Sequence, residues 1–127
     1  MNKPSIATAI LLGAAIAAAG ARPMRAWAHA FPSGEEPKVG STVAAAPTQV
    51  MITFDNPIEA LFAKLQVTDD TGNDVTAGAP VRSDNKLELS VALKPLKPGD
   101  YHVKWSVVAE DGHRTEGSYL FTLAGSP

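Results

Sequence analysis

The residues best suited to chemistry in this chain are Asp111 and His113, which are separated by a single glycine. In an extended segment, side chains two residues apart project to the same side, with Cα atoms roughly 6.5–7 Å apart. A carboxylate oxygen and an imidazole nitrogen at that spacing can converge on one metal ion, and Gly112 permits a turn that would bring them closer. Alone, the pattern is common in loops that make only a surface hydrogen bond, so further ligands are needed.

His29 supplies such ligands if the residues before it are removed. A histidine at a chain start offers its α-amine and its ring Nδ1 in one chelate, and metal binding there displaces protons. Together with His113 and Asp111 this makes three nitrogens and one oxygen, a set that suits tetragonal Cu(II). Nickel or zinc could use the same ligands, but the affinity order places copper above both. We therefore predict that His29, Asp111 and His113 bind one Cu(II) ion per chain.

Other candidate ligands are fewer. Glu59 follows the Pro57 loop and is predicted to support the site, directly or by hydrogen bonding to the amine; a solvated loop acid is the alternative. Met51 is the one methionine of residues 29–127, so a thioether Cu(I) cluster is not expected. His102 alternates with apolar residues and is expected to face outward on a strand.

The first 28 residues are predicted to be a cleaved signal peptide. Lys3 precedes an apolar and small-residue run over 6–19, and Ala26-Trp27-Ala28 matches the A-x-A cleavage pattern. The run is shorter than the about 20 residues that a membrane span needs. Cleavage after Ala28 makes His29 the first residue; a second A-x-A pattern would allow cleavage after Ala30, which removes the histidine. We favour the first site, with export of the protein and no membrane span in the mature form.

Composition excludes several classes of protein. The 127 residues contain no cysteine, which excludes a disulfide scaffold, a thiolate metal site and a cysteine nucleophile. The net charge of −2 becomes −5 in residues 29–127, which keep 8 basic and 13 acidic residues. An acidic chain of this kind is a poor nucleic-acid binder and is compatible with collecting a cation. Its length fits one domain, residues 29–127.

The elements that must position these residues are predicted to be strands. Apolar residues alternate with polar ones in short stretches, and turn residues recur every 8–15 positions, which is typical of an antiparallel β-sandwich or barrel. We expect six to eight strands in two packed sheets. The alternating positions are Val50-Ile52-Phe54, Leu65-Val67, Leu87-Leu89-Val91, Tyr101-Val103-Trp105-Val107 and Tyr119-Phe121-Leu123.

Particular residues indicate how the sandwich is built. Pro98-Gly99 predicts a turn before the longest strand, and Tyr101 at its start is either a tyrosine corner or simple core filler. Trp105 is expected to be the central core residue. The pair Glu35-Glu36 is interpreted as a solvated N-terminal segment.

The sequence resembles the CopC family of small periplasmic copper-resistance proteins, over most of residues 29–123. The resemblance implies an all-β, immunoglobulin-like or cupredoxin-like antiparallel sandwich, or Greek-key barrel, of about seven strands. It also implies a Cu(II) site formed by His29, Asp111 and His113, with Glu59 nearby. Some members add a methionine- and histidine-rich Cu(I) site, but residues 69–85 contain neither residue type. The resemblance rests on His29-Ala30, Ile52-Thr53-Phe54, Asn56-Pro57-Ile58-Glu59, Leu96-x-Pro98-Gly99-x-Tyr101-x-Val103-x-Trp105, and Asp111-Gly112-His113 followed by Gly117.

The predicted function is a periplasmic Cu(II) carrier or buffer, not an enzyme, that acts in copper homeostasis or resistance. Its expected partners are the copper ion and an inner-membrane copper transporter or another periplasmic copper protein. Two alternatives remain: an immunoglobulin-like interaction module without metal, and a copper oxygenase with a histidine brace. The second is disfavoured because Asp111 would occupy a position that oxygen needs.

Overall fold

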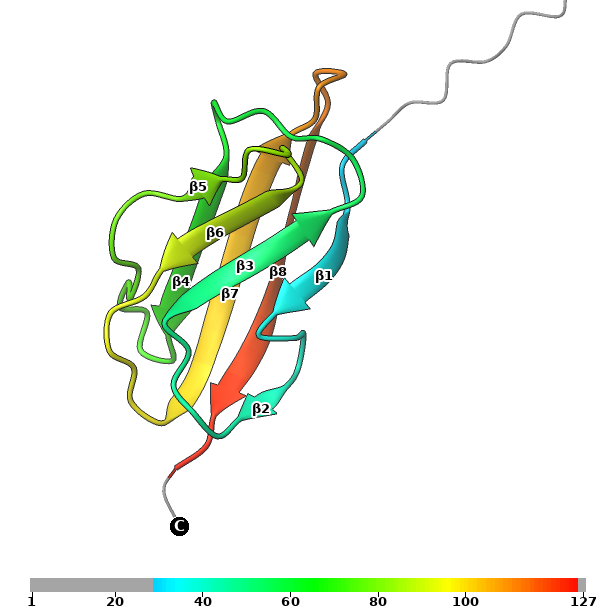
Figure 1. Cartoon of the computed structure of the whole chain (residues 1–127). Helices are drawn as coiled ribbons and strands as arrows, with labels where there is room; N and C mark the ends of the chain where they lie inside the picture. Colours follow the sequence, from blue (N-terminus) through cyan, green and yellow to red (C-terminus); the bar gives the residue numbers. More distant parts are fainter. Residues whose placement is uncertain (1–28, 126–127) are drawn as a thin grey trace, which may run out of the picture.

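The computed structural model describes residues 29–125, which form two stacked β-sheets without a helix (Figure 1). One sheet has the strand order β1-β3-β6-β5 and the other β2-β8-β7-β4. The all-β sandwich is therefore confirmed, with eight strands where about seven were expected. The strands are β1 (Pro32–Glu36), β2 (Thr42–Val43), β3 (Gln49–Phe54), β4 (Lys64–Asp69), β5 (Val81–Arg82), β6 (Glu88–Ala92), β7 (Gly99–Val108) and β8 (Arg114–Leu123).

The core lies between the sheets and follows the period-two pattern. In β7, Tyr101, Val103, Trp105 and Val107 are buried, and His102 between them is exposed as predicted. Alternation of this kind puts every second side chain on the inner face, where burial of apolar area stabilises the stacked sheets. The other core strands repeat it with Val50, Ile52, Phe54, Leu65, Val67, Leu89, Val91, Tyr119, Phe121 and Leu123.

Three strands were not predicted. Glu35 and Glu36, interpreted as a solvated segment, are half-buried and exposed, respectively, but they lie in β1, opposite Ile52 and Met51 of β3, which was not predicted. β1 lies at the edge of its sheet, where charged side chains are common because they discourage pairing with another chain. The two-residue strands β2 and β5 are too short to show a period. β2 also pairs with β8 in parallel, so one sheet is mixed.

Tyr101 and Trp105 have the structural roles expected of them. The Tyr101 hydroxyl donates to the carbonyl oxygen of Lys97 and accepts from the N–H of the same residue, which is the tyrosine corner. Trp105 packs edge-on against Phe54, with ring centroids 5.4 Å apart. Its indole lies so close to Gly117 on β8 that a Cβ there would come within 2.8 Å of it. Gly117 is therefore required by packing.

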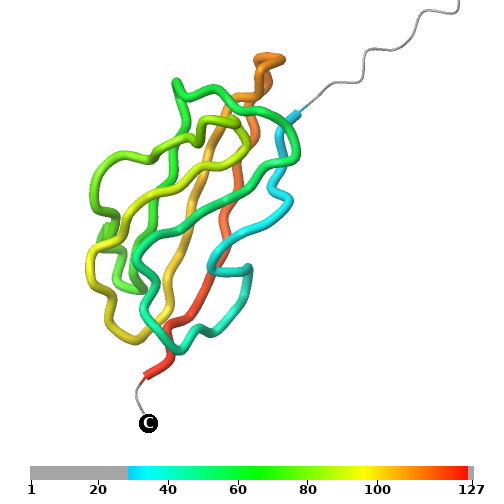
Figure 2. Tube along the Cα trace, viewed as in Figure 1, coloured from blue at the N-terminus to red at the C-terminus, as the bar shows by residue number. Residues whose placement is uncertain are grey.

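Three segments distant in sequence meet at one end of the sandwich. They are residues 29–31 before β1, the loop 55–63 between β3 and β4, and the turn 109–113 between β7 and β8 (Figure 2). The end of the described chain lies at the opposite end of the molecule. Within residues 29–125 no helix is long and apolar enough to cross a membrane. The predicted signal peptide, residues 1–28, lies outside the described residues.

Candidate metal centre

The turn between β7 and β8 brings Asp111 and His113 together. Gly112 has φ +88°, a backbone conformation that glycine adopts without strain, and its N–H donates to the Ala109 carbonyl (2.9 Å). Within this turn the backbone N–H of His113 donates to Asp111 Oδ1 (3.0 Å). The other carboxylate oxygen, Oδ2, lies 3.3 Å from His113 Nδ1. The turn expected from Gly112 is thus present.

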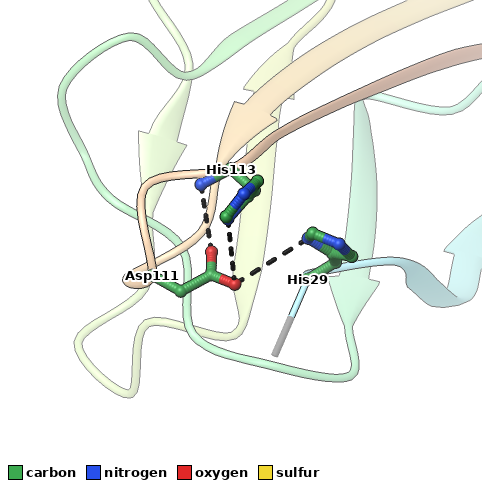
Figure 3. A group of neighbouring side chains, drawn as sticks. All are labelled: His29, Asp111 and His113. Carbon is green, nitrogen blue, oxygen red and sulfur yellow. Dashed lines mark hydrogen bonds and ion pairs between the residues drawn. The ribbon is translucent and has the colours of Figure 1, made fainter. Parts of the chain in front are cut away.

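His29 reaches the same carboxylate from the other end of the chain. Its Nδ1 lies 3.8 Å from Asp111 Oδ2, and its ring meets the His113 ring edge-on with centroids 4.7 Å apart. Asp111 therefore points between the two imidazoles, as Figure 3 shows. The three predicted ligand residues come from two segments that lie more than 80 positions apart in the sequence.

The electrostatics of the site favour a cation. The hydrogen bond from the His113 N–H lowers the pKa of Asp111, and the charges of His113 and His29 lower it further, while partial burial opposes the shift. The carboxylate is consequently ionised throughout the neutral range and presents a negative charge between two imidazoles. A divalent cation at this position would meet one anionic and two neutral donors.

The spacing of the donor atoms fits one metal ion. One ligand atom from each of His29, Asp111 and His113 can be chosen so that all three lie within 4.8 Å of one another. Nitrogen and oxygen ligands lie about 2.0–2.2 Å from a divalent metal, so two ligands of one ion are at most about 4 Å apart. Small side-chain rotations would therefore bring these atoms to binding distance. Among residues 29–125 this is the one group of three or more such side chains that meets the spacing.

Glu59 is not part of this group. Its side chain is exposed, and its backbone N–H donates to the carbonyl oxygen of Val108 at the end of β7 (2.8 Å). That bond connects the loop 55–63 to the strand that leads into the Asp111 turn. A role for the Glu59 carboxylate at the site stays a prediction.

Two further residues at the site were not predicted. Asn56 Nδ2 donates to the carbonyl oxygen of His29 (2.9 Å), and Thr115 Oγ1 donates to that of Ala30 (2.7 Å). The pattern Asn56-Pro57 indicates a turn, and Thr115 is one polar residue of an alternating strand. Neither signal tells which backbone group the side chain reaches, because the partners lie 27 and 85 positions away.

Comparison with known proteins shows the family to which the chain belongs. The CopC domain family matches residues 33–124, which is most of the chain. The chain belongs to the CopC family. The resemblance noted in the sequence is thus confirmed, and so is the fold that it implied.

The chain is also similar to individual proteins. Protein YobA of Escherichia coli strain K12 is 34% identical over 99 residues, which are 76% of this chain and 80% of that protein. Copper resistance protein C of Xanthomonas campestris pv. juglandis is 30% identical over 126 residues, covering 94% of this chain and 95% of that protein. The crystal structure of CopC from Methylosinus trichosporium OB3b superposes with a TM-score of 0.72 at 31% identity, over 78% of this chain and 97% of that one.

Proposed function

We propose that this CopC-family protein is a periplasmic Cu(II) carrier or buffer, without catalytic activity, that binds one ion per chain. The ligands are the α-amine and imidazole of His29, a carboxylate oxygen of Asp111 and a ring nitrogen of His113. Copper is the cargo, which the protein passes to a membrane copper transporter or another periplasmic copper protein. Its family membership and the name of its Xanthomonas relative support a role in copper homeostasis or resistance.

The observation that carries this proposal is the convergence of His29, Asp111 and His113 at one point. Two histidines out of three in the whole chain lie there, with a carboxylate directed between their rings. A purely structural histidine would not need a second histidine and a charged carboxylate beside it. A metal ion accounts for all three at once.

The types of donor support the cupric state. Nitrogen and carboxylate ligands suit Cu(II), whereas Cu(I) prefers thiolates and thioethers. The chain has no cysteine, and Met51 lies in β3, with its side chain half-buried and opposite Glu36 of β1. A second site for Cu(I) is therefore not part of the proposal.

Burial of Ala30 supports cleavage after Ala28. The Ala30 side chain is fully buried, and its carbonyl accepts a hydrogen bond from Thr115. A product that begins at Phe31 would lose both this contact and the His29 ligand. Cleavage after Ala28 keeps them and frees the His29 amine for the metal.

Partial exposure of the ligands supports release to a partner. The side chains of His29, Asp111 and His113 are 35%, 23% and 42% exposed. A site of this kind leaves one side of the ion open to a ligand of the acceptor, so that transfer can proceed by exchange of ligands. A fully buried site would hold the ion but would keep the ligands of the acceptor from reaching it.

The test is Cu(II) titration of the exported protein, after mass analysis of its N-terminus. We expect His29→Ala and His113→Ala each to weaken binding by at least about 10-fold, because loss even of an outer partner of a metal ligand costs about 10- to 100-fold. The matched control is His102→Ala, since this exposed histidine lies on β7 away from the site. Unchanged Cu(II) affinity in both ligand variants refutes the proposal.

A further inference from the structure

The backbone that carries His29 is held by side chains from both sheets. Asn56, two residues after the end of β3 in one sheet, donates to the His29 carbonyl (2.9 Å). Thr115, in β8 of the other sheet, donates to the Ala30 carbonyl (2.7 Å). Two successive carbonyl oxygens are therefore bound by donors from different sheets. We call Asn56 and Thr115 the terminal clamp.

These two bonds lie outside the regular strand pairing. Phe31 already pairs with Asp55: its N–H donates to Asp55 Oδ1 (2.8 Å), and its carbonyl accepts from the Asp55 N–H (2.9 Å). The chain from Phe31 onward is thus fixed to the sheet without help from the clamp. The clamp additionally holds the main chain of the two residues before Phe31, which are Ala30 and the proposed metal ligand His29.

The first residue of a chain must be held in place if its amine and side chain are to bind a metal ion tightly. The first residues of a domain are poorly ordered unless other groups hold them. If His29 had to be ordered when the ion arrives, the lost conformational freedom would be subtracted from the binding free energy. Hydrogen bonds that fix the His29 and Ala30 peptide groups remove this cost in advance.

We propose that Asn56 and Thr115 are positioning residues that hold the His29 main chain before copper binds, so that the His29 imidazole already faces Asp111. This proposal rests on the proposed Cu(II) function. It assigns the two residues an effect on affinity although neither contributes a metal ligand. A merely structural role for them would change stability and leave Cu(II) affinity as it is.

The first experiment measures Cu(II) affinity and melting temperature of the processed protein for Asn56→Ala and Thr115→Val. We expect each variant to bind Cu(II) about 10-fold more weakly, as is typical when a partner that orients a ligand is lost. Thr115→Ser keeps the hydroxyl and should restore affinity close to that of the wild type.

Matched controls are available at the other end of the sandwich. Asn73 donates to Thr71 in the turn after β4, and Thr122 on β8 donates to Asp100. Asn73→Ala and Thr122→Val remove the same kinds of group without touching residues 29–31. We expect these two variants to change the melting temperature only.

The second experiment is a double-mutant cycle between Asn56 and His29. In a His29→Ala background the clamp still positions the α-amine but no imidazole, so Asn56→Ala should weaken the residual Cu(II) affinity by a smaller factor than it does in the wild type. Equal effects of Asn56→Ala in both backgrounds would overturn the clamp as a positioning device. Unchanged affinity in both Asn56→Ala and Thr115→Val would overturn it as well.

A third measurement separates failure of the clamp from failure of the Cu(II) proposal. Backbone ¹⁵N order parameters of Ala30 in metal-free protein report whether the segment is held before copper arrives. We expect a rigid Ala30 in the wild type and a flexible one in Asn56→Ala. If the wild type binds no Cu(II), the proposed function fails, whereas equal order at Ala30 in the two proteins contradicts the clamp itself.

Discussion

At the residue scale, Asp111 uses its two carboxylate oxygens differently. Oδ1 accepts the His113 N–H at 3.0 Å and so fixes the turn, while Oδ2 lies 3.3 Å and 3.8 Å from the Nδ1 atoms of His113 and His29. In the proposed site, one carboxylate thus orients the neighbouring His113 and would itself serve as a ligand. Asparagine has the same shape and keeps the oxygen that the turn needs, so Asp111→Asn isolates the charge and the second oxygen.

We expect Asp111→Asn to preserve the fold and to weaken Cu(II) binding by at least about 10-fold. The pKa of Asp111 is lowered, so the carboxylate is already ionised at every pH from 5 to 8, and its removal should lower affinity by the same factor across that range. Titrations at several pH values check this, and a variant whose loss of affinity disappears at pH 5 contradicts it.

The lowered pKa of Asp111 also determines how the stability of the fold depends on pH. A carboxyl group whose pKa is lower in the folded than in the unfolded protein stabilises the fold above its ordinary pKa. That contribution decreases as the pH falls from about 4 through the folded-state value. Asp69 and Asp74 in the distant turn behave likewise, because hydrogen bonds from Asn73 and from Thr76, respectively, lower their pKa values.

The three side chains that converge at the candidate site could be picked out from sequence, whereas the residues that we propose to position them could not. His29, Asp111 and His113 are recognisable because histidine and aspartate bind metals through side-chain chemistry that is independent of the fold. Asn56 and Thr115 act by donating to main-chain carbonyls, and every residue has such a carbonyl. Only the three-dimensional fold determines which carbonyl lies within reach.

At the element scale, the turn between β7 and β8 is held against its neighbours. The Ala109 N–H donates to the His113 carbonyl (2.9 Å), and the Glu110 N–H donates to Pro57 in the loop 55–63 (3.3 Å). The Lys86 ammonium lies 3.3 Å from the Glu110 carboxylate. The turn therefore has a defined shape, which depends on the positive φ of Gly112.

We expect Gly112→Ala to strain the turn and weaken Cu(II) binding. No atom lies within 4 Å of the added Cβ, so the cost comes from the backbone conformation, at about 1–2 kcal/mol. Gly72→Ala is the matched control, because Gly72 has φ +89°, is equally open and lies at the far end of β4. Both variants should melt roughly 4–16 °C lower, but only Gly112→Ala should bind Cu(II) more weakly. Equal copper affinity in the two would show that the shape of the turn does not matter.

The predictability of the strands depended on their place in the sheets. β3, β4, β6, β7 and β8 have one buried face and show clear alternation, so their positions were predicted. β1 carries Glu35 and Glu36 because it lies at a sheet edge, where hydrogen bonds to β3 rather than apolar burial define the strand. β2 is fixed by pairing with β8, which is distant in the sequence, and β5 by pairing with β6, the next strand along the chain; both have only two residues. Their sequences therefore carry no local signal of their own.

At the scale of the whole molecule, the sandwich forms its core independently of the metal. The apolar side chains of the core strands are buried between the sheets, and the candidate ligands lie at the end of the sandwich where residues 29–31 meet the turn 109–113 (Figure 2). A metal that binds a preformed site stabilises the folded state by mass action and is not needed for folding. The acidic net charge of residues 29–127 adds a general attraction for cations.

This separation leads to a prediction for thermal unfolding of the processed protein. Free Cu(II) at 1,000 times its dissociation constant should raise the free energy of unfolding by about 4 kcal/mol, which for a domain of this size corresponds to roughly 15–30 °C in melting temperature. The His29→Ala/His113→Ala double variant should lose most of this increase. A chain that begins at Phe31 should melt at a lower temperature even without copper, because it lacks the buried Ala30 side chain and the bond from Thr115. If copper leaves the melting temperature of the wild type unchanged, the metal-free immunoglobulin-like module becomes the better description, since nothing then links the His29–Asp111–His113 group to a bound ion.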